Sequence, residues 1–171
     1  MDDSYFMTEE QRANLPTIVL QPSFKQFLID NGYWLLIMAV AFIGYIVAGG
    51  IMRSLFFLTV FIAVFCLFCQ YIKYARIKYI VTPEQLIYLH GFFMQQTDYM
   101  ELYRVVDYQQ HRSLLQQMTG LKTVSIYSGD RSMPHLRIIG VRIGYDIVGQ
   151  IRYRVELNKR RRGVYELTNR F

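Results

Sequence analysis

The chain has 171 residues, a formal net charge of +6 and a hydrophobic fraction of 53%. One long apolar stretch spans 33–72. About 32 residues precede it and about 100 follow it, so only the segment after it is large enough to fold as a small domain. The first residues, MDDSYFMTEEQ, are acidic where a signal peptide is basic. We therefore expect no cleaved leader, and we expect the apolar stretch to stay in the mature protein.

The apolar stretch carries Arg53 as its single formal charge. A bilayer needs about 20 residues per helical crossing, so the stretch is long enough for two. Gly49-Gly50 and Arg53-Ser54 interrupt it near the middle, which predicts a transmembrane hairpin with helices at 33–50 and 54–72. The alternative is a helical hairpin buried in a globular core, but too little other chain remains to cover it.

Charges beside the two predicted helices indicate their orientation. Three cations follow the second helix closely, whereas the turn carries one. Because positively charged residues stay on the cytoplasmic side, we predict that both termini are cytoplasmic and that the turn is outside. Aromatic residues at the same ends fit an interfacial belt. The predicted membrane-interface residues are Trp34, Tyr71, Lys73, Arg76 and Lys78.

Two capping boxes precede the hairpin, and each predicts the start of a short helix. The first begins at Thr8 and predicts a helix at 9–14; the second begins at Ser23 and pairs it with Gln26. We expect the second helix to lie along the membrane surface or to extend the first transmembrane helix inward. The β-prone run at 17–20 could instead pair with an edge of the downstream sheet.

After residue 75 the hydrophobic period changes from helical to β. The predicted strands are 77–81, 85–90, 92–102, 104–112, 122–128 and 135–139, with one helical turn between Ser113 and Gly120. A last helix at 145–160 carries an apolar stripe of Ile147, Ile151 and Val155.

This order predicts an α+β chain, in which a two-helix transmembrane hairpin precedes a small antiparallel sheet or partly open barrel, closed by a C-terminal amphipathic helix. The expected parts are a cytoplasmic N-terminal segment at 1–32, the hairpin at 33–72, and a cytoplasmic domain with a basic tail at 73–171.

Residues 75–157 resemble the bacterial pleckstrin-homology-like (PH-like) domain family. The resemblance rests on IKYIVTPEQLIYLHGFF, which begins at Ile77, and on ELYRVVDYQQHRSLLQQMTGLKTVSIYS, which begins at Glu101. Members of that family often carry two transmembrane helices just before the domain. The resemblance implies the fold, the topology and a bacterial inner-membrane location, and it implies little about activity. The loop SGDRSMPHLRI departs from the shorter, glycine-rich version of the family.

No catalytic or metal-binding motif rises above background in this sequence. Cys66 and Cys69 are spaced as C-x-x-C but lie in an apolar helix without further ligands. We interpret them as small lipid-facing residues, with palmitoylation as a weaker alternative. The three histidines are far apart, and the strand carboxylates are typical of solvated faces. We therefore expect no enzymatic activity, no cofactor and no metal.

Basic residues near the C-terminus are the one candidate binding site: Arg152, Arg154, Lys159, Arg160, Arg161 and Arg162. Cations at a helix C-terminus are favoured by the macrodipole alone. They can also contact anionic headgroups, at about 1 kcal/mol per residue near a membrane surface, or dock a protein. Nucleic-acid binding is disfavoured, because the strands lack a dense basic and aromatic face.

The leading hypothesis is a non-enzymatic inner-membrane scaffold or adaptor, whose cytoplasmic domain docks a protein partner or its own copies. An anionic-lipid-sensing module is the alternative. A small subunit of a transport or enzyme complex is a third, disfavoured because the helices carry few ionisable groups. Gly44 and Ala48 lie four apart, a spacing that lets helices approach closely, and this predicts a homo-oligomer. Membrane lipids are the other expected partner, with no small-molecule substrate.

Overall fold

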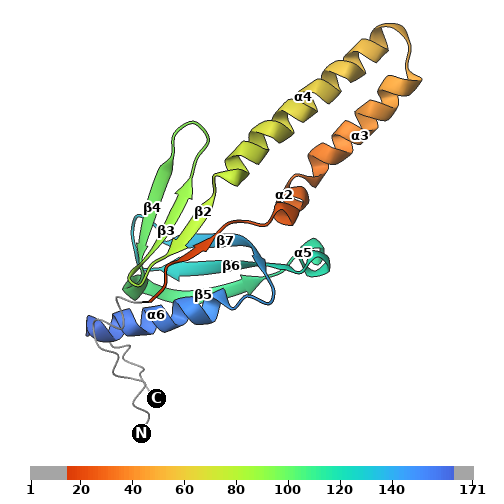
Figure 1. The fold of residues 1–171 in the computed structure, drawn as a ribbon. Helices are drawn as coiled ribbons and strands as arrows, with labels where there is room; N and C mark the ends of the chain where they lie inside the picture. The colour runs from red at the N-terminus through yellow and green to blue at the C-terminus, as the bar shows by residue number, and fades with distance from the viewer. Residues whose placement is uncertain (1–14, 164–171) are drawn as a thin grey trace.

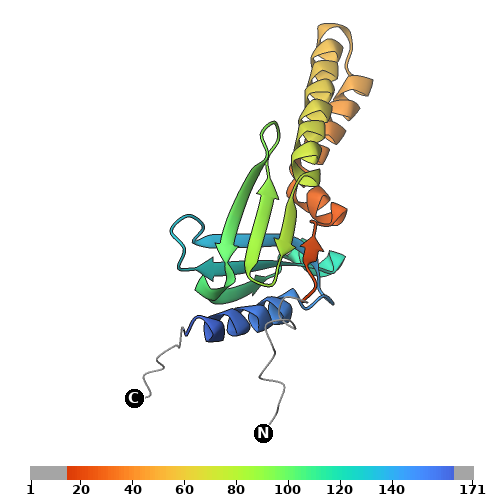
Figure 2. The same cartoon turned by 60° about the vertical axis from the view of Figure 1, so that its left-hand side comes forward.

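The computed structural model describes residues 15–163, so the helix expected at 9–14 lies outside the described residues. Two long helices, α3 (Gly32–Val47) and α4 (Gly50–Ala75), pack side by side as a hairpin that projects from a small β domain (Figure 1). The last helix, α6 (Ile147–Arg161), lies on the opposite side of that domain in both views (Figure 1, Figure 2). We refer to these two sides as the hairpin end and the α6 end.

The strands divide between two antiparallel sheets. The first has the order β1 (Ile18–Leu20), β2 (Lys78–Val81), β3 (Gln85–His90) and β4 (Gln96–Glu101). The second contains β5 (Val105–His111), β6 (Leu121–Ser128) and β7 (His135–Arg142), and the short 3-10 helix η2 (Leu102–Arg104) joins it to the first. Figure 2 shows the strands of the two sheets running in crossed directions, with α6 beneath them. The α+β order predicted from the sequence is therefore present.

Both sheets contribute side chains to one shared core. Fully buried residues include Leu86, Met100, Val124 and Ile138. The apolar stripe predicted for α6 is confirmed, because its three members are at most 4% exposed: Ile147, Ile151 and Val155. Burying an aliphatic side chain of this size contributes about 1.5–3 kcal/mol, so α6 is a major part of the core and not a surface appendage.

β1 precedes the hairpin in the chain and β2 follows it, yet the two strands pair. Val19 lies opposite Ile80 in an antiparallel register. The alternative in which residues 17–20 pair with an edge of the downstream sheet is thus confirmed. The N-terminal segment 1–32 was expected to be separate from the domain after the hairpin. It instead supplies β1 to the first sheet of that domain.

α2 (Phe24–Asp30) leads from β1 into α3 and docks on β7. The backbone N–H of Ser23 donates to the carbonyl oxygen of Gly140 at 3.3 Å. Gly140 has a φ of +67°, and a Cβ there would lie 2.9 Å from the Cβ of Gln26, so this close approach requires glycine. α2 and α3 meet at a bend of 65°. The docking holds α2 against the domain, not in line with α3.

The capping box predicted for α2 is wrong. Ser23 occupies the N-cap position, but its side chain makes no capping hydrogen bond. Gln26 donates to Asp30 at 2.8 Å and accepts from Gln116 at 2.8 Å. These partners, one of them distant in sequence, replace the local bond that the capping box would have formed.

The helical turn predicted after Ser113 is confirmed as α5 (Leu114–Thr119). Here both halves of a capping box are formed: the Ser113 hydroxyl accepts from the backbone N–H of Gln116, and the Gln116 side chain accepts from the backbone N–H of Ser113. Gly120 ends the helix in the left-handed region, at a φ of +72°.

The break inside the hairpin is shorter than predicted. α4 begins at Gly50, so the predicted start at 54 is wrong and Arg53 lies in the first turn. The Arg53 Nε donates to the carbonyl oxygen of Tyr45 at 3.3 Å, and its guanidinium lies 5.2 Å from the centre of the Tyr45 ring. These contacts accommodate the charge without a loop. α4 also continues to Ala75, beyond the predicted end at 72.

Two strand boundaries differ from the prediction by more than one residue. β4 begins at Gln96, so residues 91–95 form a loop where a strand from 92 was expected. Gly91 causes this difference: its φ is +126°, and the backbone oxygen of Met94 occupies the place of a Cβ. β7 runs to Arg142, beyond the predicted end at 139, because it pairs along most of β6.

Candidate functional site

The six cations predicted as a binding site all lie on or directly after α6, but the structure does not bring them to one surface. Arg152 is exposed and lies 4.0 Å from Glu156, one turn further along the same helix. Arg154 is buried. The remaining four, Lys159–Arg162, form the C-terminal end of α6, which we call the basic end. Only Arg152 and the basic end face solvent.

Arg154 holds the helix to the beginning of the described chain. Its guanidinium donates to the carbonyl oxygen of Pro16 at 2.7 Å and to that of Gln150 at 3.1 Å. Burial lowers the pKa of this guanidinium from its usual value. At 4% exposure the side chain is not available to a partner, so we assign it a structural role.

The basic end of α6 is fastened to the turn between β2 and β3 and to η2. Arg161 forms an ion pair with Glu84 in that turn. The Asn158 side chain donates to the carbonyl oxygen of Pro83 at 2.7 Å. The Arg162 guanidinium lies 4.0 Å from the centre of the Tyr103 ring, within the range of a cation–π contact. The orientation of this charged surface is therefore set by the domain.

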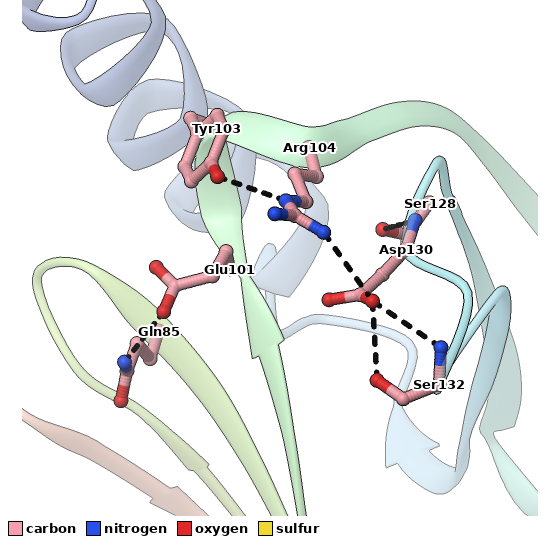
Figure 3. A network of polar contacts seen from close by, with 7 residues as sticks. All are labelled: Gln85, Glu101, Tyr103, Arg104, Ser128, Asp130 and Ser132. Carbon is pink, nitrogen blue, oxygen red and sulfur yellow. Dashed lines mark hydrogen bonds and ion pairs between the residues drawn. The ribbon is translucent and has the colours of Figure 1, made fainter.

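A second arginine reaches the same tyrosine from η2. Figure 3 shows Arg104 between Tyr103 and Asp130: its Nε donates to the Tyr103 hydroxyl at 2.8 Å, and a terminal nitrogen lies 3.4 Å from the Asp130 carboxylate. Hydrogen bonds from Ser132, together with Arg104, hold the pKa of Asp130 below its usual value. This network anchors the β6–β7 loop.

Arg104 and Tyr103 thus belong to the candidate site, although neither was predicted as a site residue. The signal available in the sequence was the pair Tyr-Arg at the junction of two predicted strands, 92–102 and 104–112, which is too common to indicate a site. The exposed surface contains Tyr103, Arg104 and the basic end, with Glu84 and Asp130 as partial counterions. Such a surface suits carboxylates or phosphates, which guanidinium groups can bind through paired hydrogen bonds.

The predicted membrane-interface residues lie at the hairpin end. Tyr71 packs against Phe27 of α2, with ring centres 5.7 Å apart, and Trp34 is half-buried at the start of α3. Lys73 lies with its Nζ 5.9 Å from the centre of the Phe92 ring in the β3–β4 loop. Arg76 and Lys78 are exposed in the link from α4 into β2 and at the start of that strand.

Gly44 was predicted to help form an oligomer, but it packs against α4 of the same chain. A Cβ at this position would lie 2.6 Å from the Phe56 ring of α4. Its small size therefore serves the packing of α3 on α4, and this face is not open to a second copy at Gly44.

A pocket of about 460 Å³ lies between α2 and the two sheets at the hairpin end. Its lining includes Gln26, Asp30, Tyr79, Gln116 and Thr123. The Gln116 side chain donates to both Gln26 and Thr123 at 2.8 Å. Burial, with a contribution from Tyr88, raises the pKa of Tyr79 above its usual value. Gln26 also donates to Asp30, so the amide side chains of the pocket have partners within it, which favours a role in holding α2 in place.

The described residues offer little for catalysis or metal binding. No group of three or more His, Cys, Asp or Glu within 15–163 is placed to hold a metal ion. Cys66 and Cys69 are not joined in a disulfide. The histidine–carboxylate pair of His90 and Asp98, at 2.9 Å, lies beside Gln96, which donates to Asp98 at 3.4 Å, and its imidazole stacks on the Tyr88 ring.

Two crossed antiparallel sheets closed by a C-terminal helix define a PH-like module. The chain is a member of the bacterial PH domain family, whose model matches residues 32–159. The match begins at the first residue of α3, so it includes the hairpin as well as the sheets. No curated protein and no solved structure matched the chain.

Proposed function

We propose that this protein is a two-span inner-membrane scaffold with both termini in the cytoplasm, and that the α6 end of its domain docks an acidic protein surface. The docked surface belongs to a partner or to a second copy of the chain. No enzymatic step is part of this proposal.

The dimensions and exposure of the hairpin support a membrane position. α4 is the one helix of residues 15–163 that is long and apolar enough to cross a bilayer by itself, and α2 with α3 qualifies only as a bent pair. With 26 residues, α4 is about 39 Å long, against about 30 Å of hydrocarbon. Only 6% of the apolar window of α4 is buried in the protein, which supports a bilayer as the medium around this helix. α3 is shorter, and local bilayer thinning accommodates such a mismatch at small cost.

Cations at the hairpin end support the orientation. Lys73, Arg76 and Lys78 are all exposed where α4 enters the domain, whereas the described turn at the far tip of the hairpin has Arg53 folded onto Tyr45. The positive-inside rule then assigns the domain to the cytoplasm.

The observation that carries the docking proposal is the position of α6. The basic end lies on the side of the domain away from the hairpin (Figure 1, Figure 2). Exposed charges interact weakly beyond about 8 Å at physiological ionic strength, so headgroups of the chain's own bilayer are a poor partner for this surface. A cytosolic surface rich in carboxylates fits its arginines and the Tyr103 ring.

A photo-crosslinking amino acid placed at Arg160 in the full chain, expressed in cells, tests the proposal. We expect a discrete protein adduct, and we expect it to disappear when Arg161→Gln and Arg162→Gln are added. The matched control changes two other exposed arginines, Arg137→Gln and Arg142→Gln on β7, and should keep the adduct. Adducts with lipid alone, or none, would overturn the docking proposal in favour of the lipid-sensing alternative or of a purely structural α6.

A reporter that is active only in the cytoplasm, fused after Phe171, tests the topology independently. We expect activity. Activity of a periplasm-only reporter at the same position would reverse the orientation, and native mass spectrometry of the protein in nanodiscs reports whether the partner is a second copy.

A further inference from the structure

Four apolar side chains of the domain are far more exposed than a folded surface requires. Outside α3 and α4, the most exposed large apolar residues within 15–163 are Phe93 at 90%, Met94 at 87%, Met118 at 84% and Leu114 at 79%. Phe93 and Met94 form the tip of the β3–β4 loop, and Leu114 and Met118 lie on α5. We call these two places the apolar tips. Exposed apolar groups in clusters mark interaction sites.

Both apolar tips adjoin the base of the hairpin. The β3–β4 loop contacts α4 through Phe92, whose ring centre lies 5.9 Å from the Lys73 Nζ. α5 contacts α2 through the hydrogen bond from Gln116 to Gln26 at 2.8 Å. In Figure 1 the loop lies on one side of the hairpin base and α5 on the other, and α6 is remote from both.

The charges around the tips match a bilayer surface. Residues 91–95 and α5 carry no formal charge. Exposed cations border them: Lys73 and Arg76 beside the loop and the hairpin base, Lys25 on α2, and Arg112 just before α5. Apolar groups that enter the interface, surrounded by cations that meet anionic headgroups, are the pattern of interfacial membrane binding.

We propose that the two apolar tips insert into the cytoplasmic interface of the bilayer on either side of the hairpin and hold the domain in a fixed orientation. The occupant of this surface is lipid, because the surface is continuous with helices that the proposed function already places in the membrane. The inference rests on that membrane position and goes beyond it. It assigns the domain a membrane-facing side and leaves the α6 end facing the cytosol.

Quenching by spin-labelled lipid tests the inference on the full chain in nanodiscs. Cys66 and Cys69 are replaced by Ala, and a single Cys carrying a fluorophore is placed at Phe93, at Met118, at Arg160 or at Phe61 on α4. Lipids with a nitroxide near the headgroup report whether the probes at 93, 118 and 160 enter the interface. Lipids with a nitroxide deep in the acyl chain report whether the probe at 61 lies in the hydrocarbon. Melting curves equal to that of the parent show that each variant is folded.

We expect headgroup-labelled lipid to quench the probes at 93 and 118 at least threefold more than the probe at 160, and deep-labelled lipid to quench the probe at 61. Quenching at 93 and 118 no stronger than at 160, with strong quenching at 61, would overturn the inference and leave the membrane hairpin intact. Quenching at one tip alone would overturn the two-sided orientation. Shielding of both tips from iodide without lipid quenching would indicate a second copy or another protein, and would overturn it as well.

Weak quenching at 61 would remove the membrane position itself, and with it this inference. The probe at 61 therefore separates failure of the inference from failure of the proposed function.

Discussion

The two ends of the domain differ in what they expose. The hairpin end presents apolar residues such as Phe93 and Met118 among scattered cations, whereas the α6 end presents arginines around Tyr103. A basic run in a chain with long apolar helices is often interpreted as a headgroup contact, yet here it lies on the side away from the hairpin (Figure 2). The comparison teaches that the direction a surface faces, and not its charge, decides which partner it can reach.

The two ends are also fastened differently to the segment before the hairpin. At the hairpin end, Gln26 of α2 accepts from buried Gln116, and Ser23 lies against Gly140. At the α6 end, Arg154 donates to the carbonyl oxygen of Pro16. The four tests below, in order of decreasing effect, remove or weaken one attachment or core contact at a time.

Ile151→Ala should have the largest effect. Ile151 is 0% exposed in the core under α6, and removal of its buried methyl groups should lower the free energy of unfolding by about 2–5 kcal/mol. Denaturant unfolding of the purified protein in detergent measures this change. The neighbouring exposed residue provides the control, since Arg152→Ala should cost about 0.5 kcal/mol or less. Equal losses for the two variants would show that α6 does not close the core.

Gly140→Ala should loosen the hairpin end. The substitution places a Cβ 2.9 Å from Gln26 at a φ of +67°. Gly120→Ala is the matched control, because its φ is +72° but nothing lies within 4 Å of the new Cβ. We expect Gly140→Ala to destabilise by about 1–3 kcal/mol more than the control, owing to overpacking. Hydrogen exchange should locate the added mobility in α2, and similar exchange in both variants would contradict the docking of α2 on β7.

Tyr79→Phe should change the response to alkaline pH. Burial raises the pKa of Tyr79 in the folded state above the unfolded value near 10. The unfolded chain therefore loses this proton first, and stability falls as pH rises above about 10, by up to about 1.4 kcal/mol per pH unit for this group. The variant should show a shallower fall in Tm between pH 9.5 and 11. Tyr99→Phe, at an exposed position, should follow the parent, and an unchanged slope for Tyr79→Phe would refute the assignment.

Glu84→Gln should have the smallest effect on stability. Its ion pair with Arg161 joins two side chains that are each about half exposed, and such pairs contribute about 0–1 kcal/mol. The difference from the parent should shrink in 1 M salt, because the charges are screened. A loss above about 2 kcal/mol that persists in high salt would mean that this contact is more than a surface ion pair.

Local patterns in the sequence predicted much of the fold. The stripe of α6 and the turn from Ser113 to Gly120 were correct because their causes are periodic burial and local hydrogen bonds. The capping box at Ser23 failed because Gln26 has a partner ninety residues away. The loop after Gly91 was predicted as a strand because Phe92 and Phe93 are typical strand residues, and the positive φ of Gly91 has no signal beyond glycine itself.

The candidate site was less accessible to sequence analysis. Arg154 is on the same helix as the basic end, and only the three-dimensional structure shows that it is buried and bonded to Pro16. The relation of α6 to the hairpin depends on how two sheets cross, which the order of the strands does not specify. Tyr103 and Arg104 joined the site through contacts with Arg162 and Asp130 that no local pattern indicates.

The pairing of β1 with β2 has a consequence for biogenesis. Fifty-seven residues, 21–77, separate the two strands, and they include the whole hairpin. A ribosome adding about 5–20 residues per second needs roughly 3–12 s between the two strands. Until then β1 has no partner and the first sheet cannot close, so the domain must finish folding after the hairpin has left the ribosome. On the proposed topology, insertion by the translocon and completion of the sheet are thereby ordered in time, and a nascent chain whose hairpin stalls would present an unpaired strand to cytosolic chaperones.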